Sequence, residues 1–188
     1  MREIKIRDAD LNDAERLLEI YGYYVLNTAI TFEYDVPSLE DFKKRMSRIM
    51  QKYPFLVIEE DGRIQGYTHA RPFVNVAAYN WSCETTIYLD KDVLKRGFGR
   101  KLYDALEAKL KKMGILNLYA RIAYPEIEDM YLTKNSAQFH EHLGFKKVGE
   151  FHKCGYKFGR WYNMICMEKI IGEHTDYPEL KLYPELDD

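Results

Sequence analysis

The sequence has no apolar run near the roughly 20 residues that a membrane-spanning helix requires. Its first residues, Met1-Arg2-Glu3-Ile4, lack the apolar core of a secretory signal peptide. Only three cysteines are present, Cys83, Cys154 and Cys166, and their spacing fits neither a metal site nor an even-numbered disulfide framework. These absences favour a protein of the reducing cytoplasm that does not act at a membrane.

A large excess of either charge is also missing. The 28 basic and 30 acidic residues give a formal charge of −2, which leaves no footprint for nucleic acid. The five histidines are scattered without metal-ligand spacing, so we expect no metal site. At 188 residues the chain fits one domain, over residues 1–171, followed by an acidic, proline-containing tail over 172–188. We expect this tail to be either disordered or packed on a partner.

Aromatic side chains are abundant, with 16 Tyr, 9 Phe and 2 Trp. Tyr and Trp combine an apolar body with a polar tip, which suits pocket walls and subunit interfaces. The excess therefore fits a homodimer, or else an aromatic-rich core.

Hydrophobic periodicity predicts an α/β (α+β) protein with a mixed central sheet and helices on both faces. The expected strands are 2–7, 55–59, 63–70, 81–89, 116–122, 145–152 and 160–170, and the expected helices are 11–26, 38–49, 99–113 and 135–142. Asp61-Gly62 is a strong hairpin signal between the second and third strands. Strand 81–89, the helix after it and strand 116–122 should form a crossover unit whose strands are parallel.

The stretch from Leu94 to Leu102 contains two glycines, Gly97 and Gly99, between a strand and a helix. Glycine allows the backbone to approach a ligand, and the first-turn N–H groups of the helix favour an anion. The sequence has no P-loop motif and is one glycine short of the dinucleotide fingerprint. With the cations Lys95, Arg96, Arg100 and Lys101 the stretch suits a diphosphate, or else is a basic turn that caps an exposed helix.

This stretch resembles motif A of the GNAT acyltransferases, in which the loop holds the diphosphate of acetyl-coenzyme A. Gly97 and Gly99 match the motif, and Leu94 stands where the family usually has Gln or Arg. The order of elements is similar to the GNAT fold over residues 2–171. Within that superfamily the chain resembles the phosphinothricin and methionine sulfoximine N-acetyltransferases. The matches are Ile20-Tyr21, Asn27-Thr28, Thr31-Phe32-Glu33, Tyr53-Pro54, Gly66-Tyr67, Ala78-Tyr79, Glu84 with Tyr88, His140-Glu141, Gly144-Phe145, Gly155-Tyr156-Lys157, Gly159 and Trp161.

The resemblance implies acetyl transfer from acetyl-coenzyme A to the amine of a small, amino-acid-like molecule. Transfer would be direct, in a ternary complex, with no metal. The alternatives are an enzyme for another amine, such as a polyamine or a protein N-terminus, and a non-catalytic acyl-coenzyme A sensor. A purely structural dimer module would leave the glycine loop unexplained.

Two residues are the predicted catalytic groups. Glu84 lies on strand 81–89 in a run with little charge, and it matches the proposed catalytic Glu of the family. A carboxylate there can take the proton of the ammonium nucleophile, directly or through water; the alternative is a solvated Glu on a strand face. His140 stands where many GNAT enzymes have a Tyr near the coenzyme sulfur. It either protonates or orients the thiolate, or it packs on its helix with its nitrogens satisfied.

The resemblance also assigns the coenzyme contacts. The strand end Ile87, Tyr88 and Leu89 would bind the pantetheine arm like an added strand, and one of its N–H groups would stabilise the oxyanion. The loop residues expected around the diphosphate are Lys95, Arg96, Gly97, Phe98, Gly99 and Arg100. The Asn that usually stands seven residues before His140 is Thr133 here, so the pantetheine contact falls on either Thr133 or Asn135.

Five residues are predicted to line the acceptor pocket: Phe32, Glu33, Arg71, Asn75 and Tyr79. Arg71 either binds a substrate carboxylate or is a surface charge at a strand end. Phe32 either lines the pocket or belongs to the core. Where the family typically has two arginines after Phe73, this chain has the uncharged run 74–77.

Overall fold

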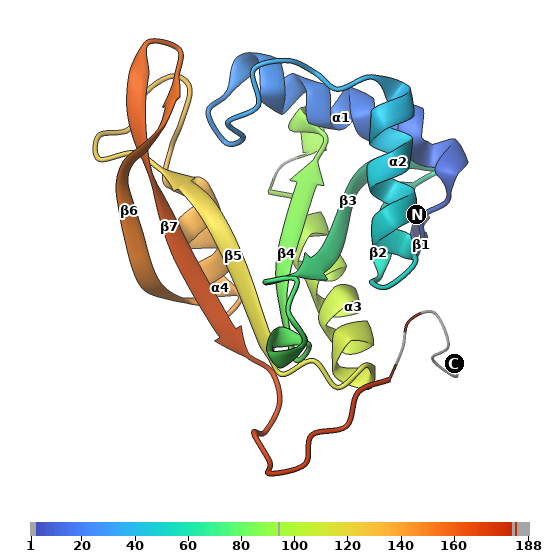
Figure 1. The fold of residues 1–188 in the computed structure, drawn as a ribbon. Coiled ribbons are helices and arrows are strands. Elements are labelled where there is room, and N and C mark those ends of the chain that lie inside the picture. Colours follow the sequence, from blue (N-terminus) through green and yellow to red (C-terminus); the bar gives the residue numbers. More distant parts are fainter. Residues whose placement is uncertain (1–2, 94, 182, 184–188) are drawn as a thin grey trace.

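In the computed structural model, which describes residues 3–93, 95–181 and 183, the strands form one mixed sheet in the order β1-β2-β3-β4-β5-β7-β6 (Figure 1). The strands are β1 (Ile4–Asp8), β2 (Phe55–Glu60), β3 (Arg63–Pro72), β4 (Ser82–Leu89), β5 (Asn117–Tyr124), β6 (Lys146–Lys157) and β7 (Arg160–Ile170). The helices are α1 (Ala14–Asn27), α2 (Leu39–Met50), α3 (Phe98–Lys112) and α4 (Asn135–His142). Short 3₁₀ turns cover Leu11–Asp13, Ala77–Tyr79 and Lys91–Val93.

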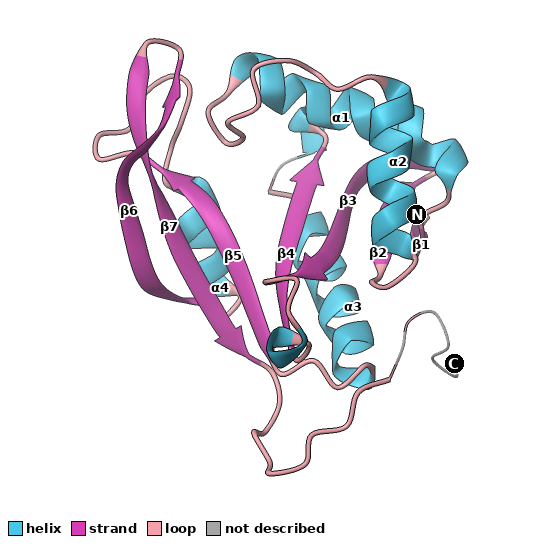
Figure 2. Cartoon of the chain, in the orientation of Figure 1, coloured by secondary structure: helices cyan, strands magenta, loops and turns pink. Residues whose placement is uncertain are grey.

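Helices cover both faces of the sheet, as the sequence predicts (Figure 2). Leu17 of α1 and Phe42 of α2 pack with β2 and β3 in one apolar cluster. Leu106 of α3 belongs to a second cluster on the opposite face, which also contains residues of α4. In the part of the chain that the structure describes, no helix has the length and apolar character needed to cross a membrane.

Local turn and cap chemistry sets several element boundaries. Asp61 and Gly62 both have positive φ angles, 50° and 77°, which is the geometry that a two-residue hairpin with the right-handed strand twist requires. Ser38 Oγ accepts the backbone N–H of Asp41 at 3.1 Å and caps α2. Asp10 caps the 3₁₀ turn Leu11–Asp13, so α1 begins at Ala14, three residues later than predicted.

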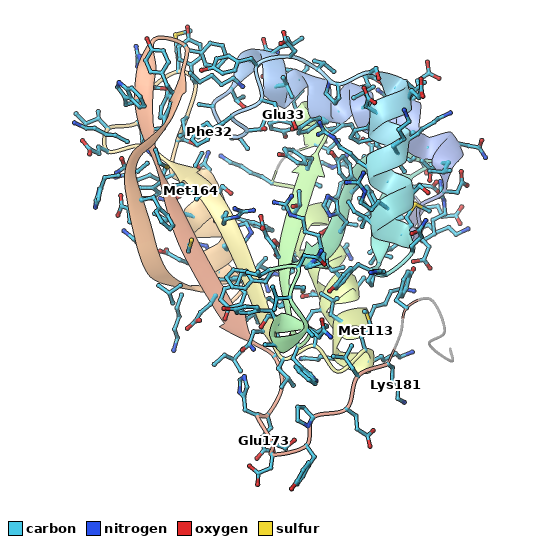
Figure 3. All side chains as sticks on the ribbon, viewed as in Figure 1. Phe32, Glu33, Met113, Met164, Glu173 and Lys181 are labelled. Carbon is cyan, nitrogen blue, oxygen red and sulfur yellow. The ribbon has the colours of Figure 1, made fainter. Side chains whose placement is uncertain are left out.

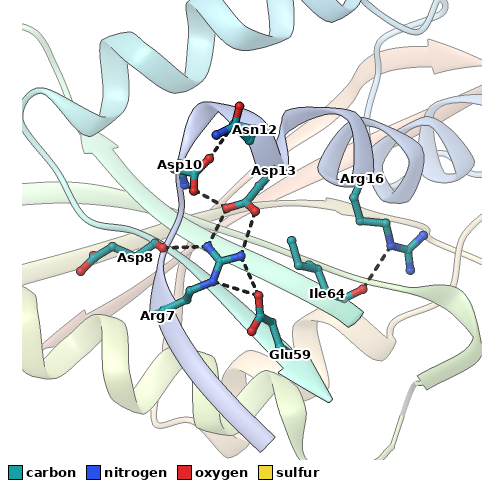
Figure 4. A network of polar contacts seen from close by, with 8 residues as sticks. All are labelled: Arg7, Asp8, Asp10, Asn12, Asp13, Arg16, Glu59 and Ile64. Carbon is teal, nitrogen blue, oxygen red and sulfur yellow. Dashed lines mark hydrogen bonds and ion pairs between the residues drawn. The ribbon is translucent and has the colours of Figure 1, made fainter. Parts of the chain in front are cut away.

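An ion-pair network fixes the end of β1 against the start of α1 (Figure 4). The Arg7 guanidinium donates to both carboxylate oxygens of Asp13, at 2.7 and 2.8 Å, and its Nε donates to Glu59 of β2 at 2.9 Å. The hydrogen bond with Asp13 is the main cause that raises the pKa of Arg7. Arg7 therefore links the sheet to the turn Leu11–Asp13, which sets the direction of α1 across one face of the sheet.

The sheet opens between its two central strands. β4 and β5 run parallel, as predicted, but their pairing in the described residues joins only Ser82–Glu84 to Asn117–Tyr119. Along its other edge β4 stays paired with β3 as far as Leu89. The two strands diverge beyond Glu84 (Figure 1), so residues 85–89 have one backbone edge free of a β5 partner.

The hairpin of β6 and β7 is longer than predicted. β6 continues to Lys157 instead of ending at 152. Its register with β7 shifts between Lys147 and Gly149 and again between Phe151 and Gly155. These bulges break the two-residue alternation on which the prediction depends.

The tail returns to its own domain as far as it is described. The Lys181 N–H donates to the carbonyl of Met113 at 2.9 Å, at the end of α3 (Figure 3). Tyr183 Oη donates to Asp8 at 2.7 Å. The described end of the tail therefore contacts the end of α3 through Lys181 and β1 through Tyr183.

Candidate active site

The site is built on β4, whose alternation sends side chains to opposite faces. Glu84, Thr86 and Tyr88 share the face covered by α1 and α2, where the Tyr88 ring packs against two tyrosines of α1. Thr85 points the other way, and its hydroxyl lies 3.0 Å from Tyr103 Oη of α3. The sheet therefore presents Glu84 toward the first two helices.

Two arginines hold the Glu84 carboxylate, which is only 7% exposed. Arg71 of β3 donates from Nη2 to Oε1 at 2.8 Å. Arg121 of β5 donates from Nε and Nη2 to Oε2 at 3.0 and 2.7 Å. A carboxylate has about four acceptor positions, so these three donors leave roughly one on Oε1. Glu84 can still accept a proton or a hydrogen bond from an amine or a water there.

Arg121 is the functional residue that sequence reasoning missed. It is the only charged side chain in β5, and this isolation in an apolar strand was the available signal. Its hydrogen bonds with Glu84 raise its pKa. Arg71 was predicted as a substrate contact or a surface charge, and the structure pairs it with Glu84. Since one of its five guanidinium donors is used there, others can still meet a ligand.

Two cavities meet beside Glu84. The larger, of about 670 Å³, lies between α2 and strands β2, β3 and β4. The smaller, of about 240 Å³, lies where β4 and β5 diverge, and Glu84, Arg121 and His140 line it. The residues that line both cavities are Thr31, Arg71, Thr86 and Tyr88. A molecule in one cavity can therefore reach a molecule in the other next to β4.

Three of the five predicted acceptor residues, Glu33, Arg71 and Asn75, line the larger cavity. Glu33 is also ion-paired with Arg45 of α2 at 2.7 Å. Tyr79 lies outside both cavities, 44% exposed on a 3₁₀ turn.

Phe32 lies outside both cavities as well, and packs toward the β6–β7 hairpin (Figure 3). Its ring stacks on Tyr162 with centroids 6.5 Å apart. A Cβ added at Gly155 would come within 2.2 Å of that ring. The packing of Phe32 thus matches the alternative that it belongs to the core, not the alternative that it lines the acceptor pocket.

His140 is buried, 4% exposed, at the wall of the smaller cavity. Its Nδ1 lies 2.7 Å from the Ser136 carbonyl, which can only accept, so Nδ1 carries the proton. Nε2 then accepts from Tyr103 Oη at 2.8 Å. Burial lowers the pKa of His140 to about 4. Both nitrogens are engaged and the ring is neutral near pH 7, which matches the packed alternative.

The glycine loop has the geometry expected of an anion site. Gly97 caps α3 with φ = +80°, no side chain bonds the helix N-terminus there, and a Cβ added at Gly97 would meet nothing within 4 Å. The N–H groups of Phe98, Gly99 and Arg100 begin the helix, so they have no carbonyl partner four residues earlier. Gly99 has a packing role too, because a Cβ there would come 2.9 Å from the Phe139 ring.

Most of the loop side chains expected around the diphosphate bond or pack against other parts of the protein. Both terminal nitrogens of Arg96 bond the Glu60 carboxylate, and Arg100 donates to the His142 carbonyl at 2.8 Å. Phe98 is buried in the core at 1% exposure. Lys95 is exposed with φ = +63°. Leu94 lies outside the described residues.

Of the strand end, Ile87 and Tyr88 line the smaller cavity. The Leu89 carbonyl accepts from Tyr24 Oη at 2.6 Å, which anchors α1 over β4. Thr133 and Asn135 are both exposed at the start of α4, and neither lines a cavity. In the described parts of the chain, no three His, Cys, Asp or Glu side chains gather as a metal site would need.

Comparison with known proteins identifies the architecture. Residues 6–166 match the acetyltransferase (GNAT) domain family. The chain belongs to the GNAT acetyltransferases. It is therefore an enzyme that transfers an acetyl group from acetyl-coenzyme A to an amine.

Individual relatives indicate which branch of the GNAT acetyltransferases this chain resembles. The phosphinothricin N-acetyltransferase of Streptomyces coelicolor is 30% identical over 173 residues, which cover 90% of this chain and 97% of the relative. The L-methionine sulfoximine/L-methionine sulfone acetyltransferase of Salmonella typhimurium is 28% identical, with 90% and 96% covered. The crystal structure of a phosphinothricin acetyltransferase from Sinorhizobium meliloti in complex with acetyl-coenzyme A superposes with a TM-score of 0.86, at 31% identity and with 97% and 96% covered.

The residues present fit acetyl-coenzyme A. The unpaired edge of residues 85–89 offers backbone groups of the kind that bind an extended arm. The open cradle at Gly97 and the first-turn amides of α3 suit a diphosphate. Arg96 and Arg100 bond protein carbonyl and carboxylate groups, so the backbone is the main donor set of the cradle.

Proposed function

We propose that the acceptor is a small, amino-acid-like molecule and that its amine attacks directly in a ternary complex. The observation that carries the proposal is the junction of two cavities at Thr86 and Tyr88, with the Glu84 carboxylate beside it. One cavity opens along the free edge of β4 and the other under α2. The relatives named for phosphinothricin and methionine sulfoximine support this class of acceptor.

Each part of the chain has a definite task in this scheme. Acetyl-coenzyme A supplies the thioester, held along residues 85–89 and at the N-terminus of α3. The acceptor arrives as an ammonium ion, which cannot attack until it loses a proton. Oε1 of Glu84 takes that proton, directly or through one water, through the acceptor position that Arg71 leaves open. A backbone N–H of the Ile87–Leu89 edge donates to the oxygen that gains negative charge as the amine nitrogen bonds to the thioester carbon. The carbon–sulfur bond then breaks, and coenzyme A leaves as a thiolate that takes the second amine proton, directly or through water.

The proposal includes a cytoplasmic homodimer. The three cysteines are free thiols, which is in keeping with a reducing compartment. Phe151, Tyr156 and Trp161 expose aromatic surface on the β6–β7 hairpin, at 47% to 61%, and such surface suits a subunit contact.

The test of the catalytic assignment is Glu84→Gln. This change keeps the shape of the side chain but removes the base, so we expect kcat to fall by about 10²–10⁴-fold. Affinity for acetyl-coenzyme A should stay within about threefold, because Glu84 is not part of the diphosphate cradle. Thiol release with methionine sulfone gives the rate, and calorimetry gives the affinity.

The matched control is Glu126→Gln, an exposed carboxylate in the connection after β5. It should leave both quantities unchanged. Retained coenzyme binding in Glu84→Gln also shows that the variant is folded. Undiminished turnover in Glu84→Gln would mean that another group removes the proton.

A further inference from the structure

A chain of buried hydrogen bonds runs beside the smaller cavity and joins three elements. Thr85 of β4, Tyr103 of α3 and His140 of α4 are only 5%, 2% and 4% exposed. The Thr85 hydroxyl lies 3.0 Å from Tyr103 Oη, which in turn lies 2.8 Å from His140 Nε2. Acetyl transfer by Glu84 and the Ile87–Leu89 edge uses none of these three side chains. Their task is therefore still to be assigned.

The direction of the hydrogen bonds is fixed from the α4 end. The Ser136 carbonyl can only accept, so His140 carries its ring proton on Nδ1 and accepts at Nε2. The single hydroxyl proton of Tyr103 then belongs to His140, and the Tyr103 oxygen is left to accept from Thr85. Burial keeps both rings neutral near pH 7, because it lowers the pKa of His140 to about 4 and raises the pKa of Tyr103.

Thr85 stands at the point where β4 leaves β5. The residue before it, Glu84, is the last that pairs with β5, opposite Tyr119. The Tyr119 carbonyl is a second acceptor for the Thr85 hydroxyl, at 3.3 Å. One hydroxyl proton cannot make two full hydrogen bonds, and the contact with Tyr103 is the shorter. Tyr103 therefore holds Thr85 toward α3 and weakens its bond to β5.

Tyr103 also lies one turn after the glycine loop. It follows Gly99 by four residues, so the two positions share one face of α3. That face packs on Phe139 of α4, whose ring centroid is 5.8 Å from that of Tyr103. The first-turn amides of α3 are the cradle that suits the diphosphate, and Thr85 begins the edge of β4 that suits the pantetheine arm. One tyrosine thus connects the two regions that fit the coenzyme.

We propose that Tyr103 is a positioning residue for acetyl-coenzyme A, which sets the free edge of β4 relative to the diphosphate cradle through its bond with Thr85. His140 supports this bond by accepting the Tyr103 proton. The inference rests on the placement of the coenzyme in the proposed function, but not on the nature of the acceptor or on Glu84 as the base. It gives His140 a role beside the cavity that needs no proton transfer to the thiolate.

The test is Tyr103→Phe, which removes only the hydroxyl. We expect the affinity for acetyl-coenzyme A to fall about five- to tenfold, the effect of roughly one hydrogen bond, because the two contact regions no longer keep the spacing that the coenzyme spans. ADP has the diphosphate without the pantetheine arm, so its affinity should stay the same. Calorimetry gives the affinity for acetyl-coenzyme A, and competition against it gives the affinity for ADP.

A second variant and a control sharpen the test. Thr85→Val removes the same hydrogen bond from its other end, so the double variant should bind acetyl-coenzyme A about as well as either single variant. The matched control is Tyr162→Phe. Tyr162 is also 2% exposed and donates one hydrogen bond, to Asp129, but it lies outside both cavities. This control should leave both affinities unchanged.

Three results would overturn the inference: full affinity for acetyl-coenzyme A in Tyr103→Phe, an equal loss of affinity for ADP, or additive losses in the double variant. A tyrosine that only supports the fold would lower the melting temperature without separating the two ligands. If Tyr103→Phe does not fold, Thr85→Val carries the same comparison of acetyl-coenzyme A with ADP. Since no acceptor is present in these measurements, the proposed function can fail in the Glu84→Gln test while the role of Tyr103 stands.

Discussion

At the scale of single residues, the contacts of Glu84 leave room for the role of base that we propose for it, although two arginines bind its carboxylate. Arg71 and Arg121 come from the strands on either side of β4 and fix the direction of the carboxylate. The remaining acceptor position on Oε1 then faces one direction only. Orientation of this kind lets a single proton acceptor meet the amine without a further side chain.

The two poorly solvated histidines make stability depend on pH. Burial lowers the pKa of both His69 and His140 to about 4, against an ordinary value of 6.5. Between these two pH values the unfolded chain binds more protons than the folded chain. The contribution of the two histidines to the free energy of unfolding is therefore fully present above pH 6.5 and is lost as the pH falls toward 4. From pH 6.5 to 5 the loss is about 2 kcal/mol per histidine, at about 1.4 kcal/mol per pH unit.

His69→Phe isolates one of the two histidines. The His69 ring lies 4.8 Å from the Phe55 ring, and its buried Nδ1 has no partner among the described residues. Phenylalanine should be accepted there with a change of about 1 kcal/mol or less at pH 7, since both partners of an aromatic contact remain. We expect the loss of stability between pH 7 and 5, measured by urea unfolding, to shrink by roughly half. Exposed His152, changed to Phe, is the control; an unaltered pH dependence in His69→Phe would contradict the assignment.

At the scale of elements, the start of α3 depends on one left-handed residue. Gly97 has φ = +80°, a conformation that costs an L-residue about 1–2 kcal/mol. Space is not the limit, because a Cβ would meet nothing within 4 Å. We expect Gly97→Ala to lower the free energy of unfolding by about 1 kcal/mol and to weaken acetyl-coenzyme A binding, with Gly97→Asn affected less because Asn tolerates this region. Calorimetry and melting curves measure both; equal effects of Ala and Asn would point to the side chain instead of the backbone.

The sequence was sufficient to predict the structural features that depend on residues close to one another along the chain. Asp61-Gly62, the start of a helix near residue 38 and the strand-helix-strand crossover are local signals, and all three are present. The partners of Arg121 and Arg96 lie 37 and 36 residues away, and no spacing rule reaches that far. The point at which β4 and β5 part is also set by the whole sheet. The resemblance could therefore predict the loop of motif A and an unpaired strand end at Ile87–Leu89, but not that the pairing ends at Glu84.

At the scale of the whole molecule, distant parts of the chain meet above the opening between β4 and β5 (Figure 1). The β6–β7 hairpin leans toward the segment after α1, where Tyr34 bonds the Tyr156 carbonyl and the Ala29 N–H donates to Tyr131 at 3.0 Å. Figure 3 shows Phe32 and Glu33 at this crossing. The segment also carries Thr31, which lines both cavities.

Lys157 is the main polar link at this crossing. Its side chain is 2% exposed, and Nζ donates to the carbonyls of Val25 and Thr31 at 2.7 and 2.8 Å, across more than 120 residues of sequence. Lys157→Met keeps the apolar stem but removes both donors, which should cost about 1–3 kcal/mol because the carbonyls lose their partner. The larger consequence concerns the position of Thr31, whose carbonyl Lys157 holds. Once Thr31 is released, we expect KM for the acceptor to rise several-fold while the affinity for acetyl-coenzyme A changes less, since the cradle at Gly97 lies on another element.

Steady-state kinetics, calorimetry and urea unfolding of Lys157→Met separate these effects. The matched control is Lys146→Met, which changes an exposed lysine at the other end of β6 and should alter none of the three. A purely structural lysine would lower stability and leave the acceptor KM at its native value at temperatures where the variant is folded. A rise in KM under those conditions shows that the β6–β7 hairpin sets the position of the segment after α1, which carries Thr31 and lines the acceptor cavity.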